Sequence, residues 1–375
     1  MASVFCRINY IMNAVIAFLL VFSAIGLIDK ILGNRFRFGE EFDKGMELMG
    51  PMALALVGIY CIGVFAAEAN ADAIAGFAAF LPFDASVIIG SLLAPDMGGL
   101  PVSLQIAETR ALGMFAGMLL STTVGVTVCF QLPVCLSGIR EKSDIDIMMK
   151  GFIIGLAVIP PGIITGGFML GLRFKELLLN FFPIIILCLI LVLGFRISAK
   201  VTSGILTLFG NMVRVLSLVL FAVVIAGVYI PSLSLADYDL VADAFISVGK
   251  MAAVVCGSLV FSKIALKLFK KPFGIIAGLL KTNEYAVIGL ILSLTTTFAM
   301  LPLFPKMDTR GKLINAAFSV GGAYILGGQM AFVSSMTTGW EITVFFVTKI
   351  IVGLCAVLAA CVIKIDSEKN NAVIS

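Results

Sequence analysis

The chain has 375 residues, of which 61% are hydrophobic and only 13% are charged, and its mean hydropathy is +1.13. Soluble domains carry about 25% charged residues, so this composition predicts a single all-α polytopic membrane domain over residues 1–375. The net charge is only +4 and histidine is absent. These features exclude His metal sites and Ser-His-Asp catalysis, and they give no sign of a cofactor, nucleic-acid binding or an enzyme.

Apolar stretches of about 20 residues predict nine complete transmembrane helices. They lie near 8–29, 47–67, 112–137, 151–172, 177–195, 214–231, 243–262, 312–336 and 341–363. Two further apolar stretches, 84–106 and 284–305, are interrupted by polar or helix-breaking residues. We therefore expect about nine to eleven segments in the membrane, two of them broken or re-entrant. The stretch 196–213 is too polar to span and is expected at the membrane interface.

The first interrupted stretch carries the main candidate for a transport site. Residues 86–105 read SVIIGSLLAPDMGGLPVSLQ, in which Pro95 stops a regular helix and Asp96 follows directly. Broken backbone in a bilayer is tolerated only where it is buried in protein or lines a wet cavity, and an ionisable group there indicates function. Asp96 is thus a candidate for binding a substrate or coupling ion, the alternative being a helix cap. Gly98 and Gly99 allow close backbone approach, either to a substrate or to another helix.

The second interrupted stretch aligns with the first at an offset of 200 residues. Residues 108–110 (Glu-Thr-Arg) then fall on 308–310 (Asp-Thr-Arg), and Pro95-Asp96-Met97 falls on Thr295-Thr296-Thr297. The break in the first stretch would then offer a carboxylate, and the break in the second would offer three hydroxyl groups. This combination suits a small cation that carries a hydroxyl group. Thr295, Thr296 and Thr297 are therefore candidate substrate-binding residues, although each hydroxyl can also bond to its own helix.

This alignment predicts two inverted repeats within the single domain. Repeat 1 covers about 8–172, a linking span covers 177–195, and repeat 2 covers about 205–363. If both broken stretches return to the side that they enter from, one side of the membrane holds 20 Lys and Arg residues and the other holds four. Because cytoplasmic loops are enriched in Lys and Arg, this arrangement places the C-terminus in the cytoplasm and the N-terminus outside.

Six other residues inside the predicted spans are candidates for a supporting or coupling role. They are Pro160, Pro161, Gln131, Gln329, Lys250 and Lys349. The prolines interrupt a span near the first break, and the glutamines suit hydrogen bonds between helices. Each lysine lies about 10–12 Å inside a span at 1.5 Å per residue. Such a lysine either extends its ammonium to the interface or pairs with a buried carboxylate.

Three segments together resemble a known family. They are GSLLAPDMGG (Gly90–Gly99), FDKGMELMGPMALALVGI (Phe42–Ile59) and IPPGIITGG (Ile159–Gly167). In content and order they are similar to the EutH family, the ethanolamine permeases of bacterial ethanolamine-utilization operons. The resemblance implies a multi-pass protein of the bacterial inner membrane. It also implies uptake of ethanolamine from outside the cell, feeding a cytosolic ammonia-lyase pathway.

Alternatives to ethanolamine transport remain open at this stage. The chain can be read as a carrier for another small amine, amino acid or cation, or, in a different class, as a non-transporting membrane subunit or scaffold. The expected partners are ethanolamine and the lipid bilayer, and the sequence leaves the oligomeric state and the coupling of transport to ions undecided.

Overall fold

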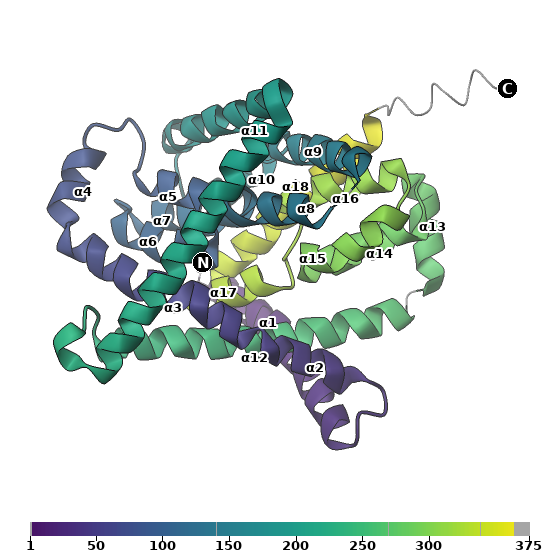
Figure 1. The fold of residues 1–375 in the computed structure, drawn as a ribbon, viewed down its shortest axis with the longest axis horizontal. Coiled ribbons are helices and arrows are strands. Elements are labelled where there is room, and N and C mark those ends of the chain that lie inside the picture. The colour runs from purple at the N-terminus through teal and green to yellow at the C-terminus, as the bar shows by residue number, and fades with distance from the viewer. Residues whose placement is uncertain (1, 140, 269, 338, 364–375) are drawn as a thin grey trace.

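A computed structural model describes residues 2–139, 141–268, 270–337 and 339–363, and within these ranges the chain is helical without a β-strand (Figure 1). Seven described helices are long and apolar enough to cross a membrane: Phe38–Ala67, Arg110–Leu136, Lys142–Met169, Phe174–Ser198, Lys200–Tyr229, Tyr238–Ala265 and Gly339–Val362. A further apolar pair, Phe273–Leu280 and Glu284–Thr295, is bent by 105°. The predicted class, an all-α polytopic membrane protein, is confirmed.

The elements of the first half include two short helices around the first break and a long π-helical stretch. They are α1 (Ala2–Ile31), α2 (Phe38–Glu47), α3 (Met49–Ala69), α4 (Ala71–Ala78), α5 (Ser86–Leu92), η1 (Pro95–Met97), α6 (Gly99–Ile106), α7 (Arg110–Met114), η2 (Phe115–Gly125), η3 (Thr127–Gln131), α8 (Leu132–Gly138), α9 (Lys142–Ala157) and α10 (Pro160–Met169). Of these, η1 is a 3-10 helix, whereas η2 and η3 are π-helical.

The second half begins with the longest helix of the described chain and contains the second break. Its elements are α11 (Phe174–Tyr229), η4 (Pro231–Leu233), α12 (Tyr238–Leu268), α13 (Lys270–Leu280), α14 (Glu284–Thr295), α15 (Thr297–Met300), η5 (Leu301–Lys306), α16 (Thr309–Gly321), α17 (Gly328–Met336) and α18 (Gly339–Val362).

The structure corrects two expectations. Residues 312–336 do not form one complete span, because α16 ends at Gly321 and α17 begins only at Gly328. The second correction concerns α11. Residues 196–213 do not form a separate interfacial segment, because α11 continues through them after a kink at Ser198, whose backbone is not helical. Each half of α11 is long enough to span a membrane. The charges that made the segment look interfacial, Arg196 and Lys200, flank the kink, and the residues after them are mainly apolar.

The first broken segment is a hairpin whose two ends meet. Pro95 begins η1 after an extended residue, and Gly98 takes a left-handed conformation with φ of 95°, which glycine adopts without steric cost. At the base of the hairpin the carboxylate of Asp84 accepts hydrogen bonds from the backbone N–H of Ser86 and of Glu108, both at 2.9 Å. The chain therefore leaves the hairpin next to the place where it entered.

The second broken segment closes in the same way. Helix α14 ends at Thr295, and the extended backbone of Thr296 separates it from α15. At the base, the backbone N–H of Asn283 donates to the Asp308 carboxylate at 3.2 Å, and the Asn283 amide donates to the Lys306 carbonyl at 2.9 Å. Both interrupted stretches thus form hairpins whose ends lie close together, which is the re-entrant one of the two alternatives that the sequence left open.

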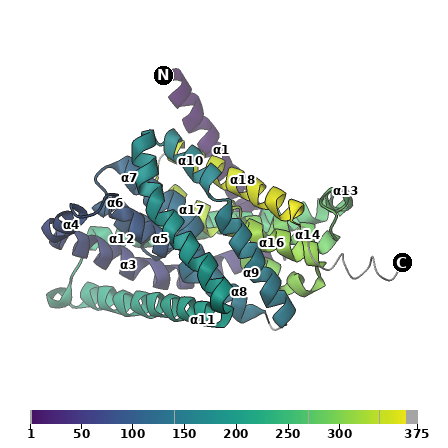
Figure 2. The ribbon, with the colours of Figure 1, turned by 90° about the horizontal axis from the view of Figure 1, so that it is seen from above.

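The two hairpins begin at opposite ends of α18. Arg110, which follows the first hairpin, pairs with Glu341 in the first turn of α18 at 2.8 Å. Arg310, which follows the second, donates to the carbonyl of Cys361 in the last turn. Both views place α5 and α6 on one side of α17 and place α14 and α16 on the other (Figures 1 and 2). Opposed hairpins are what an inverted repeat requires, and the repeat boundaries stay a prediction.

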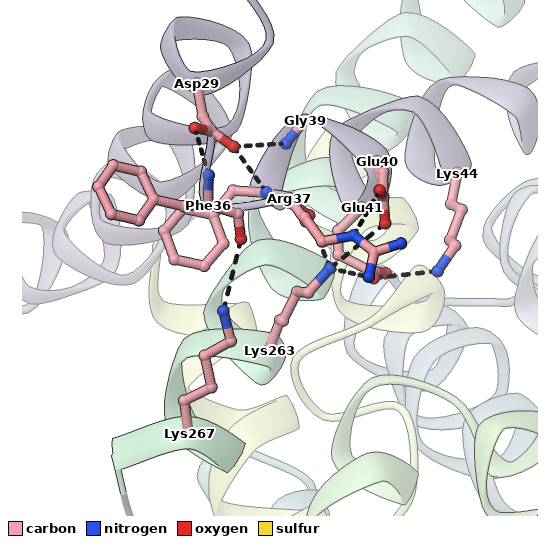
Figure 3. Close-up of polar contacts among 10 residues, drawn as sticks. Asp29, Phe36, Arg37, Gly39, Glu40, Glu41, Lys44, Lys263 and Lys267 are labelled. Atoms are coloured by element: carbon pink, nitrogen blue, oxygen red, sulfur yellow. Dashed lines mark hydrogen bonds and ion pairs between the residues drawn. The ribbon is translucent and has the colours of Figure 1, made fainter. Parts of the chain in front are cut away.

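A polar network fixes the turn between α1 and α2 to the end of α12 (Figure 3). The Asp29 carboxylate accepts from the backbone N–H of Phe36 at 3.0 Å and of Phe38 at 2.7 Å. Lys263 of α12 binds Glu41 at 3.1 Å. These contacts hold α2, and with it the start of α3, against the helix that leads into the second hairpin.

Candidate functional site

The tip of the first hairpin is pressed against the π-helical stretch η2. A Cβ on Gly90 would lie 2.1 Å from the carbonyl oxygen of Ala116, and a Cβ on Gly99 would lie 2.6 Å from that of Ala94. A Cβ on Gly98 would meet the side chain of Ile59 at 2.4 Å. Close helix packing and a positive φ therefore account for Gly98 and Gly99, whose contact with a substrate stays a prediction.

Asp96 lies at this tip, half-buried, and lines a cavity of about 460 Å³. Volumes of about 300–1,000 Å³ are typical of small-molecule sites. The cavity is walled by α3, η1, η3, α8 and the second half of α11. Its surface is mostly apolar, and its polar lining includes Asp96, Asn211, Arg214 and Ser217. A carboxylate in such a cavity can hold a small cation by charge-assisted hydrogen bonds.

Tyr324 connects the two tips. It lies in the turn between α16 and α17, where its backbone N–H donates to the Ser293 carbonyl at 2.9 Å. Its hydroxyl is close enough to Asp96, Thr296 and Thr297 to interact with all three electrostatically. Tyr324 thus links Asp96 electrostatically to Thr296 and Thr297, whereas none of the three threonines, nor Tyr324, lines the cavity that Asp96 borders.

An aromatic contact chain joins the cavity to the second tip. Phe130 lines the cavity beside Asp96, and its ring meets that of Phe298 edge-on with centroids 5.2 Å apart. Phe298 in turn contacts Tyr324 at 6.3 Å. Since Phe298 follows the three threonines directly, this chain sets the second tip against the wall that holds Asp96.

The three threonines have different environments. Thr295 shares a hydrogen bond with Ser262 of α12 at 2.8 Å, and Thr296 accepts one from the backbone N–H of Phe298. The buried hydroxyls of Thr297 and Tyr324 lie close enough to influence each other, but within the described part of the chain neither makes a hydrogen bond of normal geometry. A buried polar group without a partner is costly, so these two hydroxyls are the better candidates for contacting a bound molecule.

Lys349 forms a separate polar centre. Its ammonium donates to the carbonyl of Thr122 and to the amide oxygen of Gln329, both at 2.9 Å, and the residue is 1% exposed. The interpretation that the Lys349 ammonium extends to the interface is wrong, and pairing with a carboxylate is not seen among the described residues. The side chain does not reach the surface, and the ion pairs of the described residues include none between Lys349 and a carboxylate. Its coupling role, and that of Gln329, stay predictions.

The remaining predicted residues lie in three different places. Gln131 is buried in η3, and neither atom of its amide has a partner among the described residues. Lys250 is exposed on α12. Pro160 and Pro161 begin α10, and Pro160 lines a different apolar cavity together with Phe181. The prolines therefore stay outside the cavity that contains Asp96.

Sequence reasoning missed three residues of this region, which are Tyr324, Asn211 and Arg214. Arg214 carried a usable signal, since it is the only charged residue in the apolar run 201–229. The predicted span 214–231 placed it at the end of a helix instead of its middle, because the preceding segment was expected at the interface. Tyr324 carried no such signal, because a tyrosine within a glycine-rich apolar run is ordinary.

Comparison with known proteins gives a match along nearly the whole chain. The family model described as "Ethanolamine utilisation protein, EutH" matches residues 11–363. A Listeria monocytogenes protein named "Probable ethanolamine permease EutH" is 32% identical over 363 residues, which cover 96% of each chain. An Escherichia coli protein of the same name is 28% identical over 88% of this chain and 89% of its own. The "Uncharacterized protein YxeR" of Bacillus subtilis is 31% identical over 86% and 87% respectively. No solved structure gives a significant match.

Proposed function

The chain belongs to the EutH family of ethanolamine utilisation proteins, and we propose that it carries protonated ethanolamine across the bacterial inner membrane. It acts as a facilitator or secondary carrier rather than as an enzyme. Relatives at 28–32% identity are named probable ethanolamine permeases, which supports this substrate.

The observation that carries the proposal is the position of Asp96. This carboxylate lies at the tip of a broken hairpin, borders a cavity of about 460 Å³ and interacts electrostatically with Tyr324 of the opposing tip region. In the proposed complex, the substrate ammonium binds Asp96. The substrate hydroxyl turns toward Thr297 and Tyr324, whose own hydroxyls have no hydrogen-bond partner among the described residues.

The chemistry of ethanolamine explains why a carrier needs this arrangement. Its primary amine is protonated at neutral pH, as the lysine side chain is. A cation that enters a membrane needs replacements for its water shell. One carboxylate and several hydroxyl groups provide a charge-assisted hydrogen bond and neutral partners in a poorly hydrated site. The neutral amine crosses lipid unaided, so the carrier matters most at low pH or low ethanolamine concentration.

The deciding experiment is uptake of labelled ethanolamine into proteoliposomes that contain the purified protein, with and without imposed proton, sodium and electrical gradients. We expect saturable uptake that protein-free liposomes lack, and the gradients distinguish facilitated from coupled transport. Competition by excess choline, serine or methylamine measures the substrate range. Preferential uptake of one of these would favour the carrier for another amine or amino acid. Absence of uptake for every amine would favour a membrane subunit or scaffold.

A further inference from the structure

Arg214 occupies an unusual place in the fold. It lies at the middle of the apolar half-helix Lys200–Tyr229, roughly 21 Å from either end at 1.5 Å per residue. Its side chain is exposed at the surface of the chain. A guanidinium at the centre of a bilayer is costly unless it faces a water-filled cavity or a compensating charge, so its environment at this depth requires an explanation.

The cavity beside Asp96 provides that environment. Arg214 lines it together with Asn211 and Ser217, which lie three residues before and three residues after it on the same face of α11. Asp96 borders the same cavity from η1. The ion pairs among the described residues do not include one between Asp96 and Arg214. The two opposite charges therefore share one cavity without closing on each other.

We propose that Arg214 is the internal counter-cation of Asp96 in the substrate-free carrier. The structure holds the two groups apart, so in the proposed cycle the guanidinium moves across the cavity to neutralise the carboxylate when the site is empty, and an arriving substrate ammonium displaces it. This inference rests on the proposed function, in which Asp96 binds the ammonium group. Arginine suits the role because it stays charged at every physiological pH, is less strongly hydrated than an ammonium, and carries a long, flexible side chain.

The pairing has two consequences for transport. The guanidinium and the substrate compete for one carboxylate, so Arg214 weakens substrate binding. In return it allows the empty site to change conformation without an uncompensated buried charge, which would otherwise hold the empty carrier in one state. The empty site is neutral and the loaded site carries one positive charge, so uptake moves net charge.

The test compares Arg214→Gln with Arg196→Gln, a matched control that removes the same charge near the kink of α11 and away from the cavity. Equilibrium binding of labelled ethanolamine to purified protein is measured first. We expect Arg214→Gln to bind about tenfold more tightly than wild type, as loss of a competing ion pair predicts, and Arg196→Gln to bind like wild type. Arg214→Lys should lie between.

Transport assays then distinguish movement of the loaded carrier from return of the empty carrier. Net uptake into empty proteoliposomes requires return of the empty carrier, whereas exchange of internal for external ethanolamine does not. Arg214→Gln should lose most net uptake and keep exchange. Affinity equal to or weaker than that of wild type, or equal loss of net uptake and exchange, overturns the inference.

A double-mutant cycle on melting temperatures tests the Asp96–Arg214 pair without substrate. Asp96→Asn leaves Arg214 uncompensated and should lower the melting temperature, and adding Arg214→Gln should restore it. Additive shifts overturn the pairing. If wild-type protein binds no ethanolamine, the proposed function fails, while this cycle still decides whether Asp96 and Arg214 are coupled.

Discussion

The carboxylate of Asp84 accepts a hydrogen bond from the backbone N–H of Glu108 at 2.9 Å. These residues stand at the two ends of the first broken segment, so one side chain closes the hairpin at its base. Asp84 also accepts from the N–H of Ser86 at 2.9 Å, and its own N–H donates to Asn180 of α11 at 2.8 Å. The same residue therefore starts α5, ends the hairpin and attaches both to α11.

Asp84→Ala should destabilise the protein. The buried N–H of Ser86 loses its acceptor, and each buried donor left unsatisfied costs about 1–3 kcal/mol. We expect a lower melting temperature in detergent and reduced membrane abundance. Asp72→Ala, which removes an exposed carboxylate from α4, is the control. Equal melting temperatures for the two variants would show that the hairpin closes without Asp84.

The opposed hairpins predict a definite membrane topology. Ser234, in the exposed turn after η4, should face outside, and Lys281, in the turn between α13 and α14, should face the cytoplasm. A single cysteine at position 234 of a cysteine-free variant should react with an impermeant reagent in intact cells. One at position 281 should react only after permeabilisation. A reporter after Ser375 should likewise be cytoplasmic, and labelling in the reverse order would contradict this orientation.

Asp96→Asn separates charge from shape at the proposed site. Asparagine can still cap a helix, so insertion should be normal, whereas uptake at pH 6 should fall strongly. A charge-assisted hydrogen bond in a buried site contributes roughly 1.5–3 kcal/mol, on the order of ten- to hundredfold in affinity. Asp96→Glu should also be impaired, because its extra methylene enters a tight turn. Uptake by Asp96→Asn within about twofold of wild type, at equal abundance, would falsify the site assignment.

The three threonines should contribute unequally. Replacing all three with valine should weaken uptake and preserve insertion, since valine keeps the shape and removes the hydroxyls. Of the single variants, Thr297→Val should reduce uptake most, because its hydroxyl has no partner among the described residues. Thr295→Val should instead lower the melting temperature, since it breaks the bond to Ser262. If the triple variant takes up ethanolamine as well as wild type does, these hydroxyl groups do not bind the substrate.

Lys349→Met tests whether the buried ammonium serves function or stability. Methionine has a similar length and removes a desolvated charge, a change that is often neutral or stabilising. We expect an unchanged or higher melting temperature together with reduced uptake, as for a residue retained for function at a cost in stability. If the melting temperature and uptake both fall, Lys349 instead stabilises the packing of α18 against η2 and α17.

Features set by local chain chemistry were predictable from the sequence. Apolar stretches and a low fraction of charged residues predicted a polytopic membrane protein, and the absence of histidine excluded His metal sites and Ser-His-Asp catalysis. Pro95 and Gly98 gave the first break, because proline and a left-handed glycine act within one turn of backbone. The second stretch, 284–305, was also recognised as interrupted from its residues, and its alignment with the first placed the break at Thr295–Thr297. The segment 196–213 was misassigned because its two charges flank a kink between two spanning helices.

Which side chains meet across the fold was decided by the tertiary structure alone. Tyr324 lies near Asp96, Arg214 shares a cavity with Asp96, and Lys349 binds Thr122. The partners in each of these pairs are separated by more than a hundred residues of chain. Hydropathy cannot determine such pairings, because in a chain this apolar nearly every helix face suits either lipid or a neighbouring helix. Close backbone packing at glycines such as Gly90 selects the faces that touch, and this selection places the few polar groups together.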